Sequence, residues 1–149
     1  FDKSRVFYGL NLAKKEIYAK EQIIITEGYL DVIMLHQAGF SNAVATLGTA
    51  LTSSHIPLIK KAQAKVVLAY DGDSAGVAAA FKAAKLLISS NLEGSVVLFP
   101  QGKDPADMVK EGNLDELKKL LSSGIDLGVF IIEQIKNSYD LKNPYQKQK

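Results

Sequence analysis

The chain has no cysteine and only two histidines among its 149 residues. Without cysteine, the protein can form neither a disulfide bond nor a thiolate metal site. No apolar run approaches the roughly 18 residues that a membrane-spanning helix needs. The N-terminal residues 1–10 also lack the apolar stretch of a secretory signal. We therefore expect a cytoplasmic protein that makes no contact with a membrane.

Charge of one sign is not in large excess either, because 18 basic and 16 acidic side chains leave a formal net charge of +2. The charges are unevenly placed. Residues 1–20 hold five basic side chains against two acidic ones, and residues 136–149 hold four lysines against one aspartate. Basic ends suit a partner that carries phosphates, but charge counts alone favour ordinary solvated surface.

Apolar runs of strand length alternate with helical patterns, in a chain of the usual length for one compact domain. The predicted strands cover residues 22–26, 42–46, 65–70 and 95–99. The predicted helices cover residues 29–40, 53–63 and 75–90. Strands that are apolar throughout and separated by helices are typical of a parallel sheet with both faces covered. We expect an α/β fold with a mainly parallel sheet of about four strands, flanked by helices.

The pattern changes after Pro100, where three helical stretches follow one another without a further strand. Gly112 is expected to end the first of them, and Asp126 to cap the last. We expect a C-terminal helical segment after the sheet. The predicted division is a basic lead-in segment at residues 1–20, a catalytic sheet domain at residues 21–112 and a helical subdomain at residues 113–149.

Acidic residues follow three of the predicted strands. Glu27 follows the first, Asp71 and Asp73 follow the third, and Asp104 and Asp107 come after the fourth. Ligands of parallel α/β sheets gather at the carboxyl ends of the strands. Several carboxylates at one edge repel one another unless a cation neutralises them. Oxygen ligands suit Mg²⁺, and two such ions can clamp the reacting oxygens of a phosphoryl transfer.

Most of these acids also have a structural interpretation. Asp73 and Asp104 each precede a predicted helix and are suited to cap its first turn. Asp107 lies on a predicted surface turn, where a carboxylate is usually just solvated. Glu27 is harder to explain in this way, because glutamate is a poor N-cap residue. Glu27 is therefore the acid that most favours a metal site over a helix cap.

The histidines and glycines carry weaker signals. His36 and His55 lack a partner at metal-ligand spacing, so both are interpreted as structural. Gly28 and Gly72, next to the acids, either permit tight strand-to-helix turns or let a phosphate approach the backbone. Neither glycine belongs to a Walker loop or to a GxGxxG fingerprint.

Three stretches together resemble the catalytic core of bacterial DnaG-type primases. They read "IIITEGYLDVIMLHQAGFSNAVATLGTALT", "VVLAYDGDSAGVAAA" and "FPQGKDPADMV". They contain the Toprim signature of that family, a Glu after the first strand and an Asp-x-Asp after a later one. The leading "FDKSRVFYGLNLAKKEI" resembles the segment before this signature. The resemblance covers nearly residues 1–112 and implies a Toprim-like fold, with residues 21–112 as the Toprim catalytic domain.

The resemblance also implies an activity and partners. DnaG-type primases are DNA-directed RNA polymerases of the primosome. They synthesise short RNA primers on a single-stranded DNA template from ribonucleoside triphosphates, with Mg²⁺ or Mn²⁺, during DNA replication. Their Zn²⁺ module, their template-binding N-terminal half and their contact with the replicative helicase are not recognisable here. Since the chain also begins with Phe, we expect a fragment that is weakly active or inactive alone.

The family's acidic residues carry over onto this sequence position by position. Glu27, Asp71 and Asp73 match the catalytic, metal-binding triad, and Asp104 matches the first acid of an Asp-Pro-Asp pattern. At the second acid of that pattern this chain has Ala106. Asp107 stands one residue further on, a helical step of about 100°. The sequence leaves open whether Asp107 binds metal in its place.

The resemblance assigns substrate contacts as well. Lys3 and Arg5 match a basic segment near the family's active site and are expected to contact nucleotide phosphate or template. Gly28 and Gly72, within the signature, are expected to line the substrate site. Three other function classes stay open. One is another Toprim enzyme, a topoisomerase or a nuclease. The second is a haloacid-dehalogenase-like phosphatase, and the third is a non-enzymatic nucleotide or metal sensor.

Overall fold

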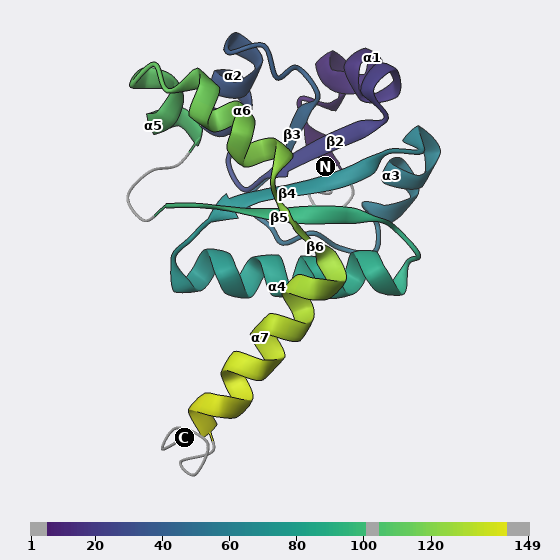
Figure 1. Ribbon diagram of the computed structural model, residues 1–149. Coiled ribbons are helices and arrows are strands. Elements are labelled where there is room, and N and C mark those ends of the chain that lie inside the picture. The colour runs from purple at the N-terminus through teal and green to yellow at the C-terminus, as the bar shows by residue number, and fades with distance from the viewer. Residues whose placement is uncertain (1–5, 101–104, 143–149) are drawn as a thin grey trace.

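The computed structural model describes residues 6–100 and 105–142, in which a six-stranded sheet lies between two layers of helices (Figure 1). Its strands run in the order β1-β3-β2-β4-β5-β6. The four central strands are β2 (Gln22–Thr26), β3 (Ala43–Thr46), β4 (Lys65–Asp71) and β5 (Gly94–Phe99). They pair in parallel, which confirms the predicted α/β fold.

Two short strands close the sheet at its edges. They are β1 (Phe7–Tyr8) and β6 (Ile125–Asp126), which pair antiparallel with β3 and β5. Phe7 pairs with Thr46, the last residue of β3, so β1 begins at the carboxyl edge of the parallel sheet. Neither strand has a sequence signal, because two residues are too few for an apolar alternation.

Seven helices cover the sheet in the described part of the chain. They are α1 (Leu10–Lys20), α2 (Tyr29–Gln37), α3 (Ile56–Ala62), α4 (Ser74–Ser89), α5 (Pro105–Lys110), α6 (Leu114–Ser122) and α7 (Leu127–Lys142). Figure 1 shows α4 along one face of the sheet and α2, α5 and α6 on the other, with α7 leading away from α4 toward the C-terminus. Residues 10–20 carry no secondary-structure prediction from the sequence, and they form α1, which buries Ala13 and Ile17.

The strands are apolar throughout because both faces of the sheet are covered. Ile23 and Ile25 point into a core shared with α1, α3, α4 and α7. Ile24 points the other way, into a second core formed with α2, α5 and α6. This alternation follows from the two-residue period of a strand. The two cores hold the carboxyl ends of the central strands at one edge of the sheet.

The predicted ends of two helices are confirmed at Gly112 and Asp126, and Gly39 ends α2 in the same way as Gly112 ends α5. Gly39 follows α2 with φ 99°, and Gly112 follows α5 with φ 75°, a conformation that glycine adopts without strain. Asp126 Oδ2 accepts hydrogen bonds from the backbone N–H groups of Gly128 at 3.0 Å and Val129 at 3.3 Å. Within residues 6–100 and 105–142, none of the helices combines the length and the apolar character that crossing a bilayer requires.

The boundaries at residues 20 and 112 stay a prediction. The elements beyond residue 113 lie directly against the sheet domain, because β6 pairs with β5 and α7 packs on α4.

Candidate active site

Glu27 and Asp71 lie side by side at the carboxyl edge of the sheet. Glu27 directly follows β2, Asp71 is the last residue of β4, and the two strands are parallel neighbours. The backbone N–H of Asp71 donates a hydrogen bond of 3.3 Å to Glu27 Oε1. Two acids that are 44 residues apart in the sequence are thus brought together by the register of the sheet.

The surroundings of Glu27 disfavour its negative charge. Burial of the carboxyl group raises its pKa above the usual value, and the charges of Asp71 and Asp73 raise the pKa further. The hydrogen bond from Asp71 acts in the opposite direction. Burial and the charge of Glu27 also raise the pKa of the neighbouring Tyr70. Glu27 as a residue remains exposed to solvent. A cation or an approaching ligand therefore has access to this concentration of negative charge.

Glu27→Gln should make the stability of the protein less sensitive to pH. A raised pKa means that ionised Glu27 destabilises the fold, and this destabilisation disappears as the pH falls below the usual value of 4.5. We expect Glu27→Gln to increase the free energy of unfolding at neutral pH and to lose this advantage below pH 4.5. Urea unfolding at both pH values measures the difference. Glu16→Gln on α1 is the control, and an equal effect of Glu27→Gln at both pH values would contradict the prediction.

Asp73 serves the fold and the electrostatics of the site together. Its Oδ1 accepts a hydrogen bond of 2.7 Å from the backbone N–H of Gly76, so Asp73 is the N-cap of α4. Its charge nevertheless acts on Glu27. A capping carboxylate keeps further lone pairs for other partners, so the cap does not exclude a role in binding a cation.

The described part of the structure does not link the remaining predicted site residues to Glu27 and Asp71. Asp107 lies in the first turn of α5, which packs against α2, and it is not among the charges that raise the pKa of Glu27. Asp104, Lys3 and Arg5 lie outside the residues that the structure describes.

The glycines of the site differ in why they are needed. A Cβ atom at Gly72 would collide with the carbonyl oxygen of Phe99, and one at Gly76 would collide with that of Asp71. These glycines let the loop after β4 and the start of α4 pass close to the sheet. At Gly28 a Cβ atom would meet only Asp31 Oδ2, at an ordinary 3.5 Å. The fold therefore requires no glycine at position 28.

A cavity of about 320 Å³ lies beside Glu27. The loop of residues 47–55, between β3 and α3, forms one wall. The lining residues are Glu27, Thr46, Gly48, Thr49, Ala50, Leu51, Tyr70 and Ala79. Gly48 has φ 63°, a left-handed conformation that disfavours other residues. This loop was not among the predicted site residues.

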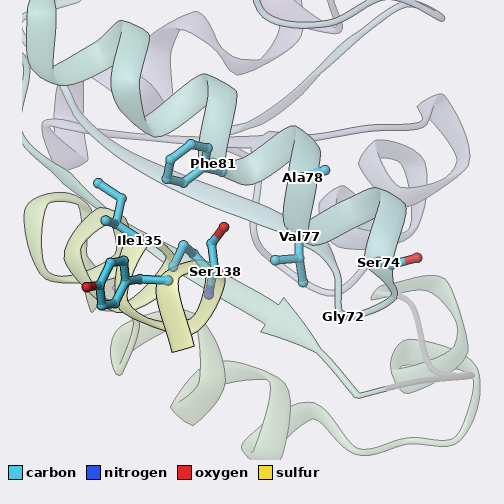
Figure 2. A pocket seen from close by; sticks show the side chains of 9 residues that line it. Gly72, Ser74, Val77, Ala78, Phe81, Ile135 and Ser138 are labelled. Atoms are coloured by element: carbon cyan, nitrogen blue, oxygen red, sulfur yellow. The ribbon is translucent and has the colours of Figure 1, made fainter. Parts of the chain in front are cut away.

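A larger cavity of about 670 Å³ lies between α4 and α7, and Figure 2 shows Phe81 of α4 and Ile135 of α7 on its walls. Its lining includes Gly72, which stands between Asp71 and Asp73 in the sequence. No charged side chain lines it, so it offers no group that could neutralise phosphates. The smaller cavity beside Glu27 is the better candidate for phosphate chemistry, because the carboxylate that lines it can hold a cation, and the cation can neutralise phosphates.

The donor set near Glu27 fits a hard cation. Glu27 and Asp71 supply carboxylate oxygens, which are the ligands that Mg²⁺ prefers. Within the described residues, no group of three or more Asp, Glu, His or Cys side chains forms a ready-made metal site. Mg²⁺ commonly binds through one or two carboxylates together with phosphates and water. The residues therefore suit an ion that arrives with a phosphate-bearing ligand.

The comparisons with known proteins agree with one another. A family model described as Toprim-like matches residues 24–109. The chain is 51% identical over its whole length to a DNA primase of Helicobacter pylori and covers 27% of that protein. It is also 46% identical over its whole length to a DNA primase of Campylobacter jejuni and covers 25% of it. The chain thus spans about a quarter of the length of these curated relatives.

Solved structures show the same similarity in three dimensions. A DnaG primase catalytic domain bound to single-stranded DNA matches 99% of this chain with a TM-score of 0.86 and 30% identity. The Escherichia coli primase catalytic core matches 99% of the chain with a TM-score of 0.85 and 30% identity. The chain covers 48% of each of these two structures.

Proposed function

The chain belongs to the Toprim-like family, and from this premise we propose that it is the metal-binding part of a DNA primase catalytic core. The similarity to bacterial DNA primases over the whole chain confirms the resemblance to DnaG-type primases. The proposed reaction is nucleotidyl transfer that makes short RNA primers on single-stranded DNA, in the bacterial cytoplasm. The main support for the proposal is that Glu27 and Asp71 lie side by side at the carboxyl edge of the sheet.

The proposed reaction joins the 3′-hydroxyl of a primer, or of a first nucleotide, to the α-phosphorus of a ribonucleoside triphosphate. Pyrophosphate leaves, and the hydroxyl gives up its proton. As an alternative to binding the ion, Glu27 could accept this proton as a general base, because its carboxylate lies at the edge of the sheet where the acids meet. Glu27, Asp71 and Asp73 would hold Mg²⁺ or Mn²⁺, with Asp104 and Asp107 as further candidates. The bound ion would neutralise the phosphates and favour ionisation of the hydroxyl.

The proposed partners are ribonucleoside triphosphates, the growing RNA primer and a single-stranded DNA template. The structural relative bound to single-stranded DNA supports a template of that kind. Lys3 and Arg5 are proposed to contact phosphate groups of the nucleotide or template. Contact with a replicative helicase is proposed for parts of the longer protein outside these residues.

Two other enzyme classes are less well supported. A topoisomerase or nuclease would share the Toprim acids, but the relatives reported above are DNA primases. A haloacid-dehalogenase-like phosphatase would use Asp71 as a nucleophile and would leave Glu27 without a role. The match to a Toprim-like family argues against it.

Titration of ATP in the presence and absence of Mn²⁺, with and without single-stranded DNA, tests the proposal. We expect ATP to bind only with the divalent ion, and DNA binding to weaken steeply as salt rises. Binding of ATP without the ion would contradict the proposal. A trapped aspartyl-phosphate at Asp71 would instead support the phosphatase.

Gly28→Ala should separate ligand binding from folding. We propose that a nucleotide phosphate approaches the backbone at Gly28, where an added methyl group would obstruct it. The fold tolerates the methyl group, because its nearest neighbour would be Asp31 Oδ2 at 3.5 Å. We expect Mn²⁺–ATP affinity to fall about tenfold while the free energy of unfolding changes by less than about 1 kcal/mol. An unchanged affinity would remove Gly28 from the substrate site.

A further inference from the structure

His55 is fully buried, and each of its ring nitrogens binds the backbone of a different segment. The backbone N–H of Thr52 donates to Nδ1 at 3.0 Å, and Nε2 lies 3.2 Å from the carbonyl oxygen of Val6. Because Nδ1 accepts a hydrogen bond, the neutral ring carries its proton on Nε2 and donates it to Val6. The ring also packs on Phe7, with the ring centroids 4.6 Å apart.

The two segments that His55 joins lie at the edge of the sheet that carries Glu27. Val6 comes directly before β1, which begins at the carboxyl edge because Phe7 pairs with Thr46. Thr52 belongs to the loop of residues 47–55, which leaves β3 at the same edge and lines the cavity beside Glu27. His55 thus connects one wall of this cavity to the start of the first strand.

We propose that His55 is a positioning residue for the metal–nucleotide site. It does not touch the ligand. It fixes the loop of residues 47–55 against the start of β1, so that the cavity beside Glu27 keeps its shape. This inference rests on the proposed function and assigns a role to a histidine that the sequence presents as merely structural.

His36, which is only half-buried, offers a comparison at the other end of the same strand. Its Nε2 lies 2.9 Å from the carbonyl oxygen of Ala43, the first residue of β3. Both histidines therefore bind a backbone carbonyl near β3. Only His55 does so at the edge that carries Glu27 and Asp71.

Two substitutions of His55 remove one contact each. Asn at this position can place its amide oxygen near the position of Nδ1 and accept from Thr52, but it does not reach Val6. Gln can place its amide nitrogen near the position of Nε2 and donate to Val6, but it no longer accepts from Thr52. His55→Asn should speed amide hydrogen exchange in residues 7–8. His55→Gln should speed exchange at the Thr52 amide.

The decisive comparison is the affinity for Mn²⁺–ATP, measured with urea unfolding on the same proteins. We expect both His55 variants to bind Mn²⁺–ATP about fivefold or more weakly than the wild type. His36→Gln should lose less stability than the His55 variants, because His36 is only half-buried, and it should keep the wild-type affinity. Unchanged affinity in both His55 variants would overturn the proposal and leave His55 a structural residue.

Failure of the proposed function would be visible separately, because the wild type itself would then not bind Mn²⁺–ATP. In that case hydrogen exchange alone decides whether His55 fixes the two segments. Faster exchange confined to the segment whose contact was removed would support the positioning role. A uniform increase over the whole sheet would overturn it.

Discussion

Asp71→Asn is expected to weaken Mn²⁺ binding on the order of a hundredfold without unfolding the protein. Asp71 lies beside Glu27 at the carboxyl edge, and its charge contributes to the raised pKa of Glu27. Removing one of two neighbouring negative charges takes away a metal ligand and also relieves repulsion. The free energy of unfolding should therefore stay the same or increase in the absence of metal.

Loss of the electron paramagnetic resonance signal of free Mn²⁺ measures the affinity, and urea unfolding measures the stability. Asp115→Asn in the first turn of α6 is the charge-matched control, since this exposed residue lies outside the site. An Asp71→Asn variant that unfolds, or that binds Mn²⁺ as the wild type does, would count against the metal role.

Gly76→Ala is expected to destabilise the protein by about 2–3 kcal/mol. Alanine normally stabilises a helix relative to glycine by roughly 0.5–1 kcal/mol. Here the sign should reverse, because the new Cβ atom would collide with the carbonyl oxygen of Asp71 and only the backbone could move. Any such movement shifts Asp71, so Mn²⁺ affinity should fall as well.

Thermal or urea unfolding of Gly76→Ala beside Gly28→Ala tests this explanation. Both substitutions add one methyl group at the start of a helix, but only the one at Gly76 meets backbone. A Gly76→Ala variant as stable as the wild type would contradict this explanation. It would mean that the Asp71 carbonyl oxygen lies farther from Gly76 than in the structure.

Much of the fold could be predicted because its signals are local. The central strands are apolar runs, and both faces of their sheet are covered by helices. Caps such as Asp126 depend on residues two or three positions away. The convergence of Glu27 and Asp71 was also predictable, since parallel strands end at the same edge. The roles of these acids stay predictions.

Other features could not be predicted because their causes are distant in the sequence. His55 binds Val6, which is 49 residues away, and no local pattern indicates that pairing. The edge strand β1 forms because Phe7 and Tyr8 pair with β3. Their own sequence does not predict a strand. The wall that residues 48–51 form beside Glu27 likewise depends on the register of the whole sheet.

The central claim is that Glu27 and Asp71 together hold a divalent ion against the phosphates of a nucleotide. A crystal structure of the chain with Mn²⁺ and a non-hydrolysable triphosphate tests this claim most directly. We predict an anomalous peak for Mn²⁺ in contact with carboxylate oxygens of both residues and with phosphate oxygens of the nucleotide. An ion bound away from both acids, or a nucleotide bound with no ion between its phosphates and Glu27, would contradict the claim.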